Sequence, residues 1–96
     1  MKVEFTARAA VDLRKAAAES RSFGTSVGTA LETSIRQSIA RAAEYPGAYA
    51  ELVGRPGVHI IPLPRYPYKI FYRVLKDRIR ILHIRHTSRR PWMAER

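Results

Sequence analysis

The residues best able to do chemistry in this 96-residue chain are cations gathered near its carboxyl end. Residues 69–96 hold nine lysines or arginines and two acidic residues, which is +7 of the net charge of +10. The candidate binding residues are Lys69, Arg73, Arg85, His86, Arg89, Arg90 and Trp92. Guanidinium groups donate paired hydrogen bonds to phosphate and carboxylate, so this cluster predicts an anionic partner. The alternative is a solvated strand face with no partner.

A histidine within this cluster adds the possibility of RNA cleavage. His86 could take the 2′-hydroxyl proton while neighbouring cations stabilise the phosphorane. Other chemistry lacks its motifs: the chain has no G-x-S-x-G elbow, no phosphate loop and no acid near a histidine in sequence. On a strand His83 and His86 would point to opposite faces, so we expect no metal site and no cofactor.

Length and composition predict one domain spanning residues 1–96. The chain has no cysteine, which excludes disulfides and suits a reducing compartment. No apolar run resembles a signal peptide or approaches the roughly 18 residues of a membrane span, so we expect a cytoplasmic protein that does not enter membranes. The charge predicts an anionic partner, which could be nucleic acid, an anionic membrane surface or an acidic protein.

The elements that must position the cations follow from hydrophobic periodicity. Residues 2–5 alternate as a short strand, and Thr6 is a candidate cap for a helix over 7–22. A second helix over 26–44 carries an apolar residue at every fourth position, and the short linker predicts an antiparallel helical hairpin.

Three further strands are predicted over residues 58–63, 68–75 and 78–86. The last two are joined by a tight turn at Lys76 and Asp77, and the last strand shifts phase, which a bulge or burial on both sides would explain. The chain is therefore predicted to be an α+β domain of order β-α-α-β-β-β, with the hairpin on one face of a small, mainly antiparallel sheet. The other face would display Lys69, Phe71 and Arg73.

Residues 57–92 resemble the RelE/ParE superfamily, the toxins of bacterial type II toxin–antitoxin pairs, and before residue 57 the resemblance rests on element order alone. The matching segments are PRYPY at 64–68, YKIFYRV at 68–74, ILHIRH at 81–86 and the pair Arg89-Arg90. RelE-like members cleave mRNA on the ribosome, whereas ParE-like members are associated with inhibition of DNA gyrase.

The resemblance implies a ParE-like toxin more than a RelE-like one. In the nuclease pattern Lys69 and Arg89 fit, and His86 would assist them. However, residues 58–63 lack the basic residues expected before the turn, and Trp92 rather than tyrosine follows Arg89. We therefore expect a non-enzymatic gyrase inhibitor, with a ribosome-dependent mRNA endonuclease and a plain nucleic-acid-binding module as alternatives.

The same resemblance implies an antitoxin, in a possible hetero-oligomer with the toxin. An acidic segment would be attracted by the charge of +10 and would fold on the toxin surface. An apolar groove beside the hairpin is the expected dock for an amphipathic helix, at Leu13, Ala17, Leu31 and Ile35. The alternative is that these four residues belong to the core.

Overall fold

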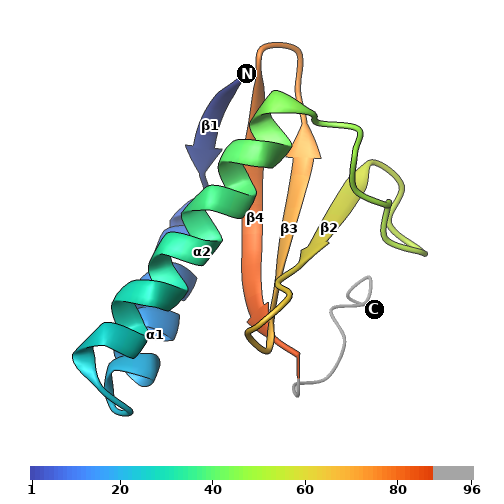
Figure 1. The fold of residues 1–96 in the computed structure, drawn as a ribbon. Helices are drawn as coiled ribbons and strands as arrows, with labels where there is room; N and C mark the ends of the chain where they lie inside the picture. Colours follow the sequence, from blue (N-terminus) through green and yellow to red (C-terminus); the bar gives the residue numbers. More distant parts are fainter. Residues whose placement is uncertain (88–96) are drawn as a thin grey trace.

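The computed structural model describes residues 1–87 and contains two helices and four strands (Figure 1). Their order is β1 (Lys2–Phe5), α1 (Ala7–Arg21), α2 (Thr25–Glu44), β2 (Val58–Pro62), β3 (Tyr68–Val74) and β4 (Arg78–His86). The predicted α+β class, element order and antiparallel hairpin are confirmed, with bounds that differ by a residue at several ends.

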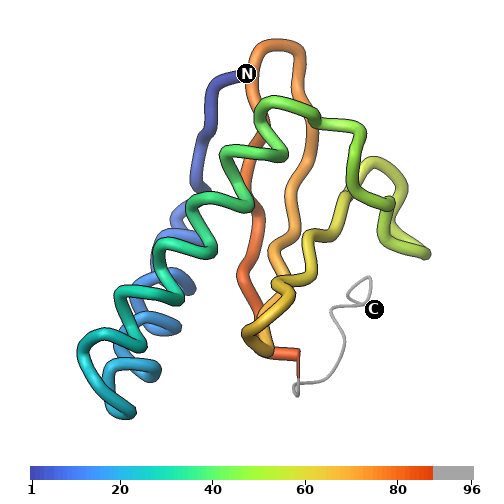
Figure 2. The backbone as a smooth tube through the Cα atoms, viewed as in Figure 1, coloured from blue at the N-terminus to red at the C-terminus, as the bar shows by residue number. Residues whose placement is uncertain are grey.

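The sheet has the strand order β1-β4-β3-β2. β1 runs parallel to β4, whereas β3 is antiparallel to both of its neighbours. The helical hairpin lies across one face, as the backbone trace makes plain (Figure 2). A parallel neighbour for β1 is possible because the helical hairpin and two strands intervene before the chain returns as β4.

Thr6 joins the first helix to the sheet. Its Oγ1 accepts a hydrogen bond from the Ala9 amide at 3.0 Å, as expected of a helix cap. The same hydroxyl lies 3.0 Å from the carbonyl oxygen of Ile81, to which it donates. α1 therefore starts at a fixed point beside β4.

The two helices approach each other closely where the hairpin closes. Gly28 is buried, and a Cβ atom there would lie 2.9 Å from the carbonyl oxygen of Ala17. Gly24 precedes α2 with a φ of 131°, a conformation that favours glycine. Glycine at both positions allows the short connection that the sequence predicts.

The phase shift in β4 is a bulge. Phe71 pairs with His83 and Tyr72 pairs with Ile81, so Leu82 has no partner on β3. Because of this extra residue, Ile79 and Ile81 before the bulge and Ile84 after it all point toward the same core, and all three are buried.

Phe71 is a correction to the sequence-based expectation. It lies on the face away from the helices, yet only 4% of it is exposed, so the prediction that it is displayed is wrong. Its cross-strand partners are Ile60 and His83, and its ring centroid lies 6.3 Å from the imidazole. Within residues 1–87, neither helix has the length and apolar character needed to span a membrane.

Candidate functional site

Cations from two neighbouring strands share the sheet face opposite the helices. Lys69 pairs with Arg85, and Arg73 pairs with Arg80, so directly opposite side chains project to the same side. We call Lys69, Arg73, Arg80 and Arg85 the basic sheet face. Three of its four members are predicted binding residues, and the structure brings them together.

Arg80 was not selected from the sequence, and its contacts differ from those of the other three. Its Nε donates to Glu4 Oε1 at 3.2 Å, so β1 neutralises that corner of the face. The signal was present in the sequence as an arginine between two apolar residues of an alternating strand. The charge of the face is therefore concentrated toward the end of the strands that holds Lys69 and Arg85.

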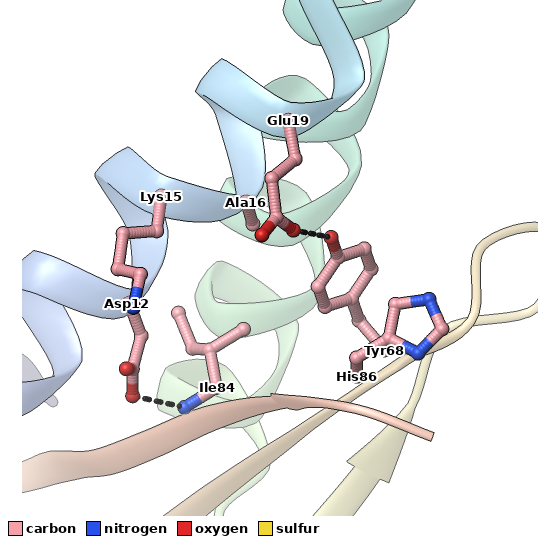
Figure 3. Close-up of a pocket in the computed structure, with 7 residues that line it drawn as sticks. All are labelled: Asp12, Lys15, Ala16, Glu19, Tyr68, Ile84 and His86. Atoms are coloured by element: carbon pink, nitrogen blue, oxygen red, sulfur yellow. Dashed lines mark hydrogen bonds between the residues drawn. The ribbon is translucent and has the colours of Figure 1, made fainter. Parts of the chain in front are cut away.

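His86 lies on the other side of the sheet. It pairs with Tyr68, whose ring centroid is 5.1 Å away, and both line a hollow against α1 (Figure 3). The Tyr68 hydroxyl donates to Glu19 Oε1 at 3.3 Å. Lys69 and His86, which the nuclease alternative combines, are thus on opposite faces. The remaining predicted residues, Arg89, Arg90 and Trp92, lie outside the described residues.

A buried carboxylate and imidazole form a contact that the sequence did not reveal. Asp12 Oδ2, on α1, accepts a hydrogen bond from His83 Nδ1 and another from the Ile84 amide at 3.0 Å. The absence of an acid near a histidine in sequence therefore did not exclude an acid that orients a histidine in the fold. Seventy-one residues separate Asp12 from His83, and only the docking of α1 against the exposed edge of β4 joins them.

The partners of His83 determine its protonation. Arg8 Nη2 and Arg85 Nη1 each lie 3.2 Å from Nε2. Arginine only donates, so Nε2 must accept and the proton must sit on Nδ1, facing Asp12. Burial lowers the pKa of His83 below its usual 6.5, Asp12 opposes this, and the two arginines add to the lowering. His83 is therefore neutral at pH 7.

The four residues predicted to hold an antitoxin lie in the core. Leu13, Ala17, Leu31 and Ile35 are at most 7% exposed and face the sheet or the other helix. The exposed apolar surface of the hairpin is at its closed end instead. Phe23 is 82% exposed there, and a groove runs from it past Val27 to the segment before β3.

No metal-binding cluster accompanies these sites. In the part of the chain that the structure describes, no three histidine, aspartate or glutamate side chains gather closely enough to hold an ion. His59 is engaged in packing: its ring stacks on Tyr72 at 5.1 Å, and its Nδ1 lies 2.7 Å from the Tyr49 carbonyl oxygen.

The sequence matches a known protein family over most of its length. A sequence model of the family described as ParE toxin of type II toxin–antitoxin system, parDE, matches residues 3–91, which is nearly the whole chain. The chain belongs to the ParE toxin family. The superfamily resemblance predicted from residues 57–92 is thereby confirmed and extends over the helical hairpin.

Solved structures agree on the fold of this ParE-family protein. A chain of the chromosomal ParDE system from P. aeruginosa superposes with a TM-score of 0.78 at 23% identity, covering 90% of this chain and 95% of that one. The isolated E. coli RelE toxin gives 0.70 at 20% identity, with coverage of 93% and 86%. A chain of the intact E. coli RelBE complex gives 0.69 at 21%, with coverage of 99% and 98%. Among curated protein sequences, none matches significantly.

Proposed function

We propose that this toxin inhibits DNA gyrase in the cytoplasm, is not a nuclease, and is neutralised by an acidic antitoxin. One observation carries the choice of target. On the face that holds Lys69 and Arg85, the adjoining strand β2 contributes the half-buried Ile60 and the exposed Pro62. These apolar side chains suit contact with another protein and supply no acid, base or cation for RNA cleavage.

The placement of His86 also favours this proposal over a ribosome-dependent nuclease. Lys69 projects from the basic sheet face, whereas His86 packs on Tyr68 beneath α1. A base and a phosphate-stabilising cation must reach one ribose-phosphate unit, and the sheet separates these two. Arg73 and Arg85 with Lys69 would instead form the surface that contacts gyrase.

The antitoxin part of the proposal rests on charge and on the hairpin. A net charge of +10 attracts an acidic segment and speeds its association. Since Leu13 and Leu31 are buried, we place the apolar contacts of the antitoxin at the exposed groove beside Phe23 and Val27. A large aromatic side chain left 82% exposed suits the role of an anchor residue for such a partner.

The target is tested with purified protein in two assays. We expect inhibition of gyrase supercoiling and no cleavage of mRNA on translating ribosomes. A Lys69→Ala/Arg85→Ala variant should lose inhibition at least tenfold, while Arg14→Ala/Arg36→Ala, with the same charge loss on the helices, should retain it. Ribosomal cleavage that disappears in Arg89→Ala would instead establish the nuclease. Duplex DNA binding without either activity would favour a nucleic-acid-binding module, with an affinity that falls steeply with salt.

The antitoxin is tested with the product of the neighbouring reading frame, which we expect to be small and acidic. Phe23→Ser should weaken its complex with the toxin at least tenfold. Val53→Ser is the matched control, because Val53 is 90% exposed but lies on the connector between α2 and β2. Equal effects of the two substitutions would exclude the hairpin groove as the dock.

A further inference from the structure

The two edges of the sheet differ in how they are covered. β2 forms one edge, and the connector before it bonds to that strand. The Ile60 amide donates to the Ala50 carbonyl at 3.0 Å, and the Leu52 amide donates to β2 at 2.7 Å. Pro62 ends the strand and has no amide hydrogen to offer. The edge at β2 is therefore blocked along most of its length, whereas β1 forms the other edge (Figure 1).

The backbone of β1 bonds to its neighbour through alternate residues. The amide of Lys2 donates to the turn before β4 at 3.3 Å, and the amide of Thr6 donates to β4 at 3.1 Å. In this ladder the N–H and C=O groups of Val3 and Phe5 point away from β4. Within residues 1–87 no other group bonds to them. β1 thus presents an unpaired strand edge, which is a template for another strand.

We infer that β1 pairs with β1 of a second copy of this chain, antiparallel about a twofold axis at Val3. A twofold contact needs a strand that is complementary to itself, and such an axis makes the two strands antiparallel. The Val3 amide and carbonyl would exchange hydrogen bonds with those of Val3 in the second copy. The contact goes beyond the proposed action on gyrase and does not depend on it.

The charges of β1 select this register. Lys2 and Glu4 flank Val3, so pairing about Val3 puts Lys2 opposite Glu4 of the second copy on both sides of the axis. Opposite charges directly across a strand pair stabilise it, and like charges destabilise it. The nearest other registers that join the outward-facing groups put Lys2 opposite Lys2 or Glu4 opposite Glu4. Self-pairing is therefore favourable about Val3 and unfavourable on either side of that register.

The side chains of β1 are accessible for this contact. Lys2 is exposed, and Glu4 meets Arg78 and Arg80 at 3.4 and 3.2 Å. Within residues 1–87 both of these contacts use Oε1, which leaves Oε2 for Lys2 of the second copy. On the other face Val3 is 40% exposed, so the two copies of this side chain would cover each other at the axis. The paired segment is short, so we expect a weak contact with a Kd between about 10 μM and about 1 mM.

The mass of the whole protein in solution tests the contact. Sedimentation equilibrium is run at concentrations below and above the expected Kd, and the average mass should rise from one chain toward two. Amide hydrogen exchange at Val3 should slow over the same range, because that N–H has no acceptor among residues 1–87 of its own chain. A single-chain mass at every concentration would overturn the inference. Masses beyond two chains would also overturn it, since a twofold contact is closed.

Proline at position 3 tests the strand edge selectively. The Val3 amide points away from β4, so Val3→Pro removes no hydrogen bond of the single chain, and it blocks the bond to a second copy. The variant should keep its thermal unfolding midpoint and lose the dimer. A dimer that persists unchanged in the folded variant would use another surface, and the inference would be wrong.

A charge reversal tests the register, and it remains informative if the proline variant fails to fold. Lys2→Glu places two carboxylates opposite each other on both sides of the axis and should weaken the dimer by about tenfold or more. Arg65→Glu makes the same change of charge at an exposed position before β3, and should alter the affinity by less than about twofold. Equal effects of the two reversals, or no effect of Lys2→Glu, would refute pairing about Val3.

Discussion

Replacing Asp12 by alanine should be among the most damaging single changes to this fold. The carboxylate joins α1 to β4 through the Ile84 amide and His83 Nδ1, and it also meets Arg8. β1 pairs with β4 only as far as Ile81, so beyond that point the edge of β4 depends on α1 for its hydrogen-bond partners. Alanine would leave a backbone amide and a buried imidazole N–H without an acceptor.

The magnitude follows from the three contacts. A hydrogen bond to a charged group contributes about 1.5–3 kcal/mol, and the two bonds to β4 are of this kind. The Arg8 contact adds less than about 0.5 kcal/mol because that side chain is 64% exposed. Folding of the native chain removes the Asp12 carboxylate, which is 12% exposed, from water, and the alanine variant avoids this desolvation cost. We therefore expect the free energy of unfolding to fall by about 2–4 kcal/mol in total. For a domain of this size that is a fall in Tm of roughly 10–25 °C.

Urea and thermal unfolding followed by circular dichroism measure this cost. Glu32→Ala is the control, because Glu32 also pairs with an arginine four residues along its helix but both side chains are well exposed. It should change the free energy of unfolding by less than about 0.5 kcal/mol. If Asp12→Ala costs no more than Glu32→Ala, the carboxylate does not hold α1 to β4.

An amide at the same position separates the two bonds to β4. Asp12→Asn can still accept from the Ile84 amide, but its NH2 group would then face His83 Nδ1. That nitrogen would have to accept, which moves the proton to Nε2 and against the two arginine donors. We expect about half the cost of alanine and a changed tautomer in the imidazole 15N spectrum. An unchanged tautomer would contradict the assigned geometry.

Three further predictions concern pH and packing. The pKa of His83 in the folded protein lies below 6.5, so as the pH falls the unfolded chain binds the proton first. The contribution of His83 to the free energy of unfolding is therefore complete above pH 6.5 and is lost as the pH falls below that value. The urea midpoint should fall with the pH in this range, and His83→Gln should abolish that pH dependence. Burial raises the pKa of Tyr72 to about 12, so the free energy of unfolding should fall by about 3 kcal/mol as the pH rises from 10 to 12. Tyr72→Phe should abolish that fall. At pH 7 the same variant should cost about 1 kcal/mol, because the Pro46 carbonyl, which accepts from the Tyr72 hydroxyl at 2.7 Å, loses its donor. Gly28→Ala should destabilise the fold by about 1–3 kcal/mol, because the added Cβ atom would overlap atoms of α1. Gly47→Ala is the control and should be neutral, since no atom lies within 4 Å of a Cβ built there. Equal unfolding midpoints for the two variants would refute the close packing of the helices.

Patterns local in the chain predicted most of the fold. The apolar residue at every fourth position of 26–44 predicted α2, and Thr6 predicted the start of α1. The broken alternation in 78–86 predicted either a bulge or burial on both sides, and the structure has a bulge at Leu82. Each of these signals depends on backbone geometry within a few residues. The resemblance of residues 57–92 to the RelE/ParE superfamily added the family, which the match over residues 3–91 confirms.

The side chains at the candidate site were predicted less completely. Lys69, Arg73 and Arg85 share a face because alternation along a strand fixes direction. The burial of Phe71 was not predicted, and for Leu13 and Leu31 the sequence left both an exposed groove and the core open, since periodicity gives a side chain its direction but not what lies over it. The antitoxin contacts we propose therefore moved to the exposed end of the hairpin.

The sequence alone determined the elements, their order, the strong positive charge and the toxin family. Tertiary structure alone decided that Asp12 meets His83, that Arg8 and Arg85 converge on one nitrogen, and that Lys69 and His86 lie on opposite faces of the sheet. The physical reason is that propensity and periodicity act over one or two turns of chain. Contacts between α1 and β4 instead join residues more than seventy positions apart, and only the docking of the whole hairpin on the sheet brings them together.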